Sequence, residues 1–239
     1  MSPEAIQSVH RTVQPLVFET GNEDAPYSTM GTAFLVGHEG RSFVITARHL
    51  LRPEELTPLC IFPSDSSQRL VPLQDIFFLP THEVCDDFAD FAIIEIDRQR
   101  LDSETLQASV LDLRLAATDW FTARDTSRFV VLGYPRDHAF VDYESEVVST
   151  KCFALQGRYL KASHSKHLHE LELESDLGLS TFSGFSGAPV FSWLETSPGI
   201  ARIALCGMAV QGTVGSMCVR FIAWEIIAEA IKVKCRHHS

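Results

Sequence analysis

Short runs of apolar residues, each ended by glycine, proline, aspartate or serine, recur along most of the chain. They are rich in β-branched and aromatic residues, which favours strands over helices. In the first half the predicted strands are Thr12–Glu19, Thr32–Val36, Ser42–Thr46, Leu59–Phe62, Ile76–Leu79 and Phe91–Ile96. In the second half they are Phe129–Leu132, Glu146–Leu155, His169–Leu173, Ala188–Trp193, Ile203–Gln211 and Met217–Ile222. Many short strands at regular spacing indicate antiparallel barrels or sandwiches.

Two other patterns organise the chain. A polar stretch over about residues 98–127 separates the two sets of strands. Over Ala223–Val233 the period changes, because Ile227 and Ile231 are four residues apart and polar residues occupy the opposite face. This pattern predicts an amphipathic helix that packs onto the fold at its end.

Composition and charge narrow the function classes. A chain of 239 residues can bury a sizeable core as one large domain or two small ones. Its net charge of −11, with no basic cluster, disfavours nucleic-acid binding. The first residues show no secretory signal, and no apolar run is long enough to span a bilayer. Six cysteines without C-x-x-C spacing are predicted to be reduced thiols, so we expect a cytoplasmic protein.

A candidate nucleophile lies in the segment GFSGAPVF (184–191), where Ser186 stands between glycines directly before an apolar run. An attacking serine needs a general base, a group that orients the base, and donors for the oxyanion. The nucleophile elbow of α/β-hydrolases requires a following helix and partners downstream of the serine. Here a strand follows, and the only downstream histidines are His237 and His238, in the predicted disordered tail. That alternative is therefore rejected.

Suitable partners occur upstream of the serine. His49 comes just after the predicted strand Ser42–Thr46. Asp90 lies further along the chain, at the start of the apolar strand that ends at Ile96. An acid at the start of a strand can hold a histidine in one tautomer. The order His49, Asp90, Ser186 is the order of the chymotrypsin arrangement.

Six blocks in this order resemble the trypsin-like serine peptidases of the chymotrypsin fold, in their disulfide-free bacterial type. They are GTAFLV (31–36), TARH (46–49), DFAII (90–94), GYP (133–135), GFSGAP (184–189) and GMAVQG (207–212). The resemblance implies an all-β fold of two six-stranded antiparallel β-barrels with a C-terminal α-helix. We expect residues 1–115 to form the N-terminal barrel, with His49 and Asp90, and residues 116–239 the C-terminal barrel, with Ser186.

The resemblance also implies a role for each site residue in a serine endopeptidase. Ser186 is expected to be acylated, His49 to act as the base, and Asp90 to orient His49. The backbone N–H groups of Gly184 and Ser186 are expected to form the oxyanion hole. Ser180, Val210 and Gly212 are expected to bind substrate, with Ser180 at the floor of the S1 pocket and the other two offering main-chain hydrogen bonds.

Several residues depart from the family pattern. Leu50 and Phe182 stand where secreted members carry disulfide cysteines, and Val210 replaces a serine that usually hydrogen-bonds the catalytic acid. Phe185 replaces the aspartate that pairs with a freed N-terminus in members activated by cleavage. We therefore predict activity without N-terminal cleavage.

The expected specificity follows from the same comparison. No acid occupies Ser180, which counts against Lys/Arg at P1, although Asp176 is near in sequence. Ala209 replaces a histidine of glutamate-specific members. We expect a small or medium-sized apolar P1 residue.

Two alternatives stay open. A trypsin-fold module that is catalytically silent, or that a partner protein must activate, would bind peptide segments through the same cleft. An H-x-H pair, His167 and His169, lies in a stretch (163–169) that could bind zinc, but a solvated loop is the preferred interpretation because no further ligand is evident. We expect no metal or other cofactor, and a protein or peptide as substrate.

Overall fold

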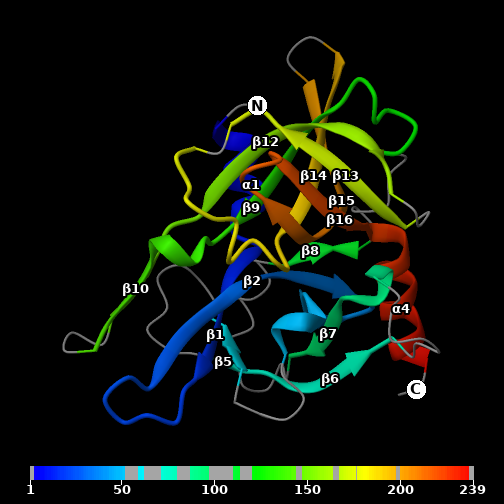
Figure 1. The fold of residues 1–239 in the computed structure, drawn as a ribbon. Helices are drawn as coiled ribbons and strands as arrows, with labels where there is room; N and C mark the ends of the chain where they lie inside the picture. The colour runs from blue at the N-terminus through cyan, green and yellow to red at the C-terminus, as the bar shows by residue number, and fades with distance from the viewer. Residues whose placement is uncertain are drawn as a thin grey trace.

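The computed structural model describes residues 3–51, 59–61, 71–79, 87–96, 110–113, 120–143, 147–163, 167–175, 177–197 and 200–236. These residues are mostly strands, with a helix near each end (Figure 1). No helix among them is both long and apolar enough to cross a membrane.

The first half of the chain forms one open sheet. Helix α1 (Pro3–His10) precedes it, and its strands run in the order β5-β4-β1-β2-β3-β7-β6, with β8 paired in parallel to β2. Their bounds are β1 Val13–Glu19, β2 Tyr27–His38, β3 Arg41–Thr46, β4 Leu59–Ile61, β5 Val71–Pro72, β6 Gln74–Phe78, β7 Ala92–Glu95 and β8 Leu111–Asp112. This sheet is a half-barrel that does not close within the described residues.

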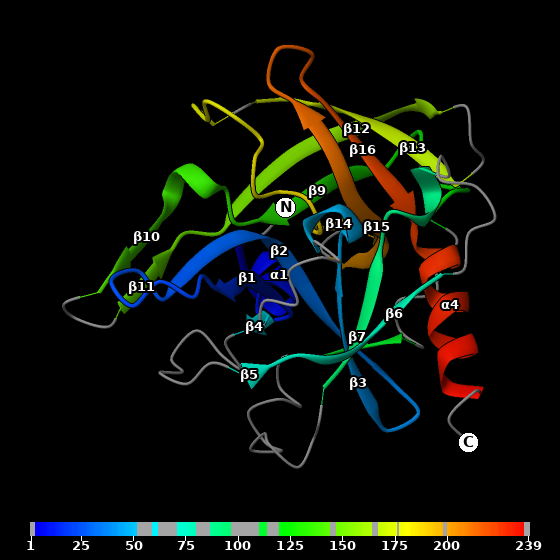
Figure 2. The ribbon, with the colours of Figure 1, turned by 60° about the horizontal axis from the view of Figure 1, so that its bottom comes forward.

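The second half forms a closed barrel in the order β12-β13-β16-β15-β14-β9. The barrel strands are β9 Arg128–Gly133, β12 Phe153–Ala162, β13 Leu168–Leu173, β14 Pro189–Ser197, β15 Ile200–Thr213 and β16 Cys218–Ala223. Strands β10 (Ala139–Asp142) and β11 (Val147–Thr150) form a separate hairpin that projects beside the β1–β2 hairpin (Figure 2). Residues of β12 alternate between buried and exposed because one face lines the barrel interior.

The two halves share a hydrophobic core. Alternate residues of β3 point to opposite faces, so Val44 joins the core of the half-barrel while Phe43 and Ile45 join a cluster with residues of the barrel. Barrel residues in that shared cluster include Phe191 and Met208. Both faces of β3 are therefore buried, which explains the apolar run 43–45 at its centre.

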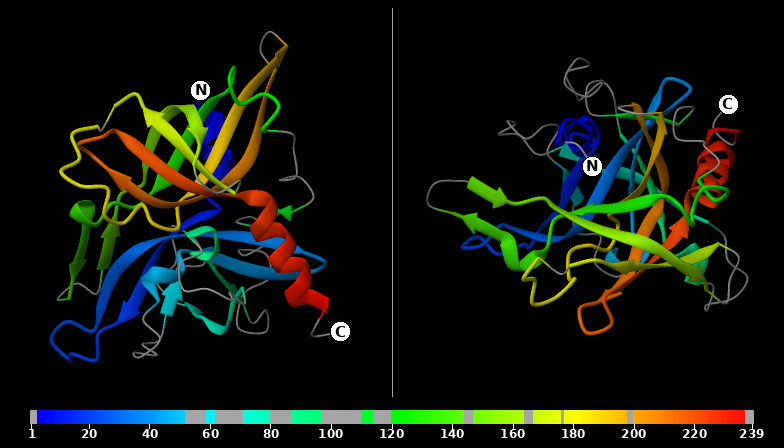
Figure 3. Two further views of the ribbon diagram at one scale, coloured as in Figure 1. Left: turned by 45° about the vertical axis from the view of Figure 1, so that its right-hand side comes forward. Right: turned by 90° about the horizontal axis from the view of Figure 1, so that it is seen from above.

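The C-terminal helix α4 (Trp224–Arg236) follows β16 directly and runs along both halves (Figure 3). Its buried face includes Trp224, Ile227 and Ile231, which belong to the shared cluster. At its other end, the buried Lys234 donates a hydrogen bond to the Asp75 carbonyl at 3.3 Å. The helix thus connects the barrel to the half-barrel.

The chymotrypsin-like fold predicted from the sequence is confirmed, with differences. The first half is an eight-stranded sheet that does not close within the described residues, where a six-stranded barrel was expected. The predicted strand Glu146–Leu155 is two strands, because the chain leaves the β10–β11 hairpin and enters β12 at Phe153. Helix α1 and strand β10 were not predicted. His169 lies in β13 and is 3 % exposed, so the solvated-loop interpretation of 163–169 is wrong for this residue.

Candidate active site

His49 is presented by a turn of 3-10 helix, Arg48–Leu50, that follows β3 after one residue. The Leu51 N–H donates to the Arg48 carbonyl at 2.9 Å and closes the turn. The buried strand thus ends in a short rigid turn that leaves the imidazole 44 % exposed. This side chain is accessible while its backbone is fixed by the core.

Asp90 precedes β7, the strand that pairs with β3, so the two side chains start from neighbouring strands. The Asp90 carboxylate contacts His49 with both oxygens. Oδ1 accepts the His49 backbone N–H at 2.8 Å, and Oδ2 lies 2.6 Å from the ring Nδ1. The Arg48 N–H also donates to the Asp90 carbonyl at 3.3 Å. The imidazole is therefore oriented by a bidentate contact.

Ser186 lies on the other side of the imidazole, with its Oγ 3.0 Å from His49 Nε2. A carboxylate only accepts hydrogen bonds, so Nδ1 of a neutral imidazole carries the proton and Nε2 presents a lone pair to the serine hydroxyl. The three side chains expected to form a triad are thus brought together across 137 residues of sequence. Such an arrangement can accept a proton from the serine as its oxygen attacks.

The backbone around Ser186, here called the Ser186 loop (residues 182–188), turns its carbonyls away from the nucleophile. The Ser183 carbonyl accepts the Arg136 N–H at 2.9 Å, and the Phe185 carbonyl accepts the Ala188 N–H at 2.9 Å. In a trans peptide the N–H points opposite to the carbonyl. No described residue accepts a hydrogen bond from the N–H of Gly184 or Ser186. These are the two groups expected to form an oxyanion hole, and both are available to a ligand.

The glycines of this loop are required by its conformation. Gly184 has φ +97°, and a Cβ there would lie 2.3 Å from the Tyr134 carbonyl oxygen. Gly187 has φ +85°, and a Cβ there would lie 2.0 Å from the Thr32 carbonyl oxygen. A side chain at either position would combine backbone strain with a clash against fixed backbone.

Phe185 points into the barrel core and is 3 % exposed. Its ring packs against Phe182, with centroids 6.0 Å apart, and lies over Gly133, where an added Cβ would come 2.6 Å from it. The position that carries an acid in cleavage-activated members is therefore occupied by an apolar anchor. The Ser186 loop is thus fixed by packing of Phe185 in the barrel core, where those members use an ion pair.

Val210 and Gly212 lie on β15 at the edge facing the Ser186 loop. Ala209 still exchanges backbone hydrogen bonds with Gly187 and Ala188, but no described backbone partner lies on this side of the residues after it, so the edge offers free backbone groups from Val210 onward. A bulge between Ala209 and Gln211 displaces Val210, whose carbonyl oxygen is 3.5 Å from Ser186 Oγ. A Cβ at Gly212 would lie 2.9 Å from the Phe182 ring, so this ring lies against the expected wall of the substrate pocket.

Ser180 is exposed, and its hydroxyl donates to the carboxylate of Asp137. Asp137 comes from the 3-10 turn Arg136–His138 and was not identified from the sequence. An acid thus lies beside the expected pocket floor even though Ser180 itself is neutral. Asp176, the alternative acid, lies outside the described residues.

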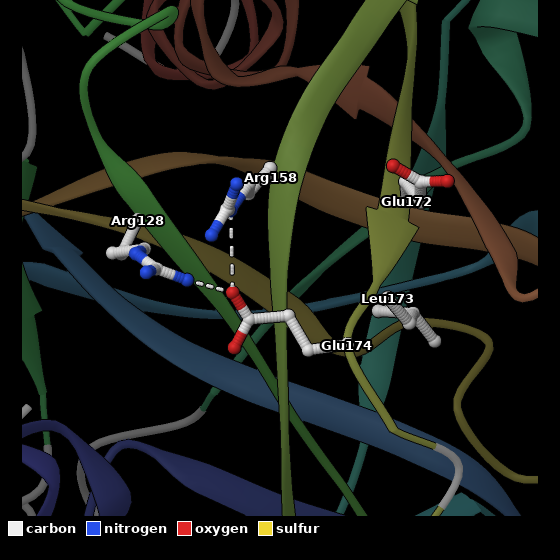
Figure 4. Close-up of a pocket in the computed structure, with 5 residues that line it drawn as sticks. All are labelled: Arg128, Arg158, Glu172, Leu173 and Glu174. Atoms are coloured by element: carbon white, nitrogen blue, oxygen red, sulfur yellow. Dashed lines mark ion pairs between the residues drawn. The ribbon is translucent and has the colours of Figure 1, made fainter.

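The other groups in the molecule are separate from this site. A surface pocket beside β9, β12 and β13 is lined by Arg128, Arg158, Glu172, Leu173 and Glu174 (Figure 4). Its centre is an ion pair of Glu174 with both arginines, at 3.4 Å from Arg158. No group of three metal-ligating side chains is found within the described residues. The pocket therefore carries none of the candidate residues.

None of the described cysteines forms a disulfide, and they are Cys60, Cys152, Cys206, Cys218 and Cys235. Burial raises the pKa of Cys60 to about 11, so this thiol is a poor nucleophile. Cys85 lies outside the described residues.

Three residues that the sequence did not single out complete the site. Arg136 and Thr32 hydrogen-bond the Ser186 loop, and Asp137 contacts Ser180. The first two act through contacts between distant segments, for which the sequence holds no local signal. Thr32 lies in the strand motif GTAFLV, which indicates a strand but gives no sign of a contact with the Ser186 loop.

Comparisons with known proteins identify the family and the fold of the chain. The family described as "Trypsin-like peptidase domain" matches residues 31–196, more than half of the chain. Among solved structures, a thermostable serine protease, AL20, from an extremophilic microorganism matches with a TM-score of 0.56 and 14 % identity. This match covers 91 % of the present chain and 92 % of that chain, and at this identity it shows the fold alone. No curated protein matches the sequence.

Proposed function

Because the chain belongs to the trypsin-like peptidase domain family, we propose that it is a serine endopeptidase acting through His49, Asp90 and Ser186. The observation that carries the proposal is the continuous contact from Asp90 Oδ2 through the imidazole to Ser186 Oγ, at 2.6 and 3.0 Å. The available N–H groups of Gly184 and Ser186 support it further.

The reaction follows from this geometry. Ser186 Oγ attacks the carbonyl carbon of the peptide bond as its proton passes to His49 Nε2. Asp90 stabilises the resulting imidazolium, and the N–H groups of Gly184 and Ser186 donate to the oxyanion. Collapse of the tetrahedral intermediate breaks the C–N bond, and the amine leaves with the proton from His49. Water then attacks the acyl-enzyme in the same way, which releases the acid and restores Ser186.

The substrate is proposed to bind as an extended strand along the free edge of β15 at Val210 and Gly212. The expectation of an apolar P1 residue rested on the absence of an acid at Ser180. The carboxylate of Asp137 lies beside Ser180 and would favour a basic P1 residue instead. We propose that P1 preference is set between this acid and the apolar wall at Phe182. A peptide-library profile of the purified protein separates an apolar from a basic P1.

The rival is a trypsin-fold module that is silent or needs an activating partner. It predicts a loop whose N–H groups are turned away or self-satisfied, whereas here they are available. The buried Phe185 supports a loop that is ordered in the full-length chain. A cytoplasmic location is part of the proposal, and the free thiols are compatible with a reducing compartment.

Covalent labelling of the full-length protein by a fluorophosphonate tests the proposal. We expect stoichiometric labelling of wild type without N-terminal cleavage, and none of Ser186→Ala. Ser183→Ala, three residues away on the same loop, is the matched control and should label like wild type. A folded wild-type protein that is not labelled, or is labelled only after trimming or addition of a partner, would contradict an autonomous enzyme.

A further inference from the structure

Thr32 lies beneath the Ser186 loop although it belongs to the other half of the molecule. It is part of β2, is fully buried, and is separated from Gly184 by 152 residues of sequence. A buried hydroxyl needs hydrogen-bond partners, and the partners of the Thr32 hydroxyl lie at the candidate site.

The Thr32 side chain satisfies both of its hydrogen-bonding functions at the candidate site. Its Oγ1 donates to the Gly184 carbonyl at 2.7 Å and accepts the Tyr134 N–H at 2.9 Å. Its backbone N–H donates to the Ser186 carbonyl at 3.0 Å. One residue thus holds the carbonyls of both residues whose N–H groups face the substrate.

The directions of these bonds fix the peptide planes on both sides of Gly184. The preceding plane is held by the Arg136 N–H on the Ser183 carbonyl. The following plane is held at its oxygen by Thr32 and at its nitrogen by the bond from Phe185 N–H to the Phe182 carbonyl at 3.1 Å. Gly184 has no side chain to restrict its own rotation. The following plane is therefore held by two contacts, and the bond from Thr32 is the one that comes from the other half of the molecule.

The support beneath Thr32 is itself rigid. The Thr46 hydroxyl donates to the Thr32 carbonyl at 2.8 Å, and Thr46 closes β3, the strand that leads to His49. The same carbonyl limits the space at Gly187, as described above. The base and the Ser186 loop are thus placed from one hydrogen-bonded unit at the β2–β3 hairpin.

We propose that Thr32 is a positioning residue for the reaction: its hydroxyl and N–H anchor the peptide planes that follow Gly184 and Ser186, and so hold these two residues where their own N–H groups point at the oxyanion. This inference rests on the proposed function. Thr32 touches no reacting atom, so its loss should slow the formation of the tetrahedral state and leave substrate binding along β15 unchanged. Removing an oxyanion donor outright costs roughly 100- to 1,000-fold, so a misaligned donor is expected to cost about 10- to 100-fold.

The test compares Thr32→Val, which keeps the shape and removes the hydroxyl, with Thr32→Ser, which restores it. Thr12→Val is the matched control, because Thr12 is also buried and donates to a carbonyl, that of Val9, at 2.7 Å away from the site. The maximal rate of fluorophosphonate labelling and the concentration for half-maximal rate are measured per folded molecule. Crystal structures of wild type and Thr32→Val give the direction of the Gly184 carbonyl.

We expect Thr32→Val to lower the maximal rate with an unchanged half-maximal concentration, while Thr32→Ser and Thr12→Val stay within about threefold of wild type. Equal maximal rates for Thr32→Val and Thr12→Val would overturn the inference and leave the proposed function standing. If wild type is not labelled, the proposed function fails and the crystal structures decide the inference alone. A Gly184 carbonyl that turns only in Thr32→Val supports it, and one that keeps its direction overturns it.

Discussion

At the scale of single residues, the geometry around Ser186 depends on positions that tolerate only one or two side chains. Gly184 is the most restricted, because its φ of +97° and the nearby Tyr134 and Arg136 backbone leave no room for a Cβ. Its conformation turns the N–H toward the nucleophile. A glycine here thus serves the site rather than the stability of the barrel.

Gly184→Ala should therefore lose activity out of proportion to stability. We expect fluorophosphonate labelling to fall by at least about 100-fold, as for removal of one oxyanion donor. Gly40→Ala is the control, because Gly40 has φ +79° but nothing within 4 Å of an added Cβ. It should lose about 1 kcal/mol of stability from backbone strain and keep its labelling rate. Equal labelling of the two variants would show that the backbone conformation reserved for glycine at position 184 is not needed for the reaction.

The sequence predicts some of these residues and not others for a physical reason. The sequence itself contains the order His49, Asp90, Ser186 and the glycines beside the serine, so these features can be predicted before the fold is known. The contact of Thr32 with Gly184 and that of Asp137 with Ser180 depend on how two halves meet. Neither the periodicity nor the spacing of residues in the sequence predicts such contacts between distant segments.

At the scale of elements, helix α4 contacts the half-barrel through an ion pair between its buried Lys234 and the partly exposed Glu95. Glu95 of β7 accepts two hydrogen bonds from the Arg41 guanidinium, with Nε at 2.7 Å, and raises the pKa of Arg41. It also lies 3.9 Å from Nζ of Lys234, which is 3 % exposed. Removing Glu95 would leave the Lys234 charge with less compensation in a dry environment.

Glu95→Ala is accordingly expected to lower the free energy of unfolding by about 2–3 kcal/mol. Glu229→Ala is the comparison, because Glu229 pairs with Lys232 and Arg236 at the surface of the same helix. That variant should change stability by less than about 1 kcal/mol. Urea unfolding measures both, and a similar loss in the two variants would argue against a buried clamp.

Among the elements, those with long apolar runs were predictable and those fixed by context were not. The predicted helix Ala223–Val233 corresponds to α4, and ten of its thirteen residues fall in the predicted range. Helix α1 has only eight residues, too few for a clear period, and it is held by packing of Val9 into the shared cluster. Strand β5 has two residues, one of them Pro72, and carries no strand pattern.

At the scale of the whole molecule, stability depends on a histidine buried under an aromatic cluster of the barrel. His169 packs edge-on against Trp120 at 5.2 Å and contacts the Tyr159 hydroxyl through Nδ1 at 3.1 Å. Burial lowers the pKa of His169 to about 4. His169 is therefore protonated only near pH 4 in the folded protein, whereas in the unfolded chain it is protonated near pH 6.5.

Acid should destabilise the fold through this residue. Between about pH 6.5 and pH 4 the unfolded chain binds more protons at this site, so the free energy of unfolding falls as the pH is lowered, by up to roughly 3 kcal/mol, and this contribution levels off below pH 4. His169→Phe lacks the titrating group, and its stability should fall less over the same range. Urea titrations at several pH values give the difference. Identical slopes for both proteins would remove His169 as the cause.

Because Thr32 belongs to the first half and contacts Gly184 in the second, the candidate site is assembled only when both halves are folded. The base and the acid lie in the first half and the nucleophile in the second, and the carbonyls of Gly184 and Ser186 are bonded to Thr32 of the first half. Under the proposed function, a molecule with one half folded has no means of cutting a chain. The nascent or partly unfolded protein is then unable to cleave other proteins in the cell, and this protection does not depend on an inhibitory segment.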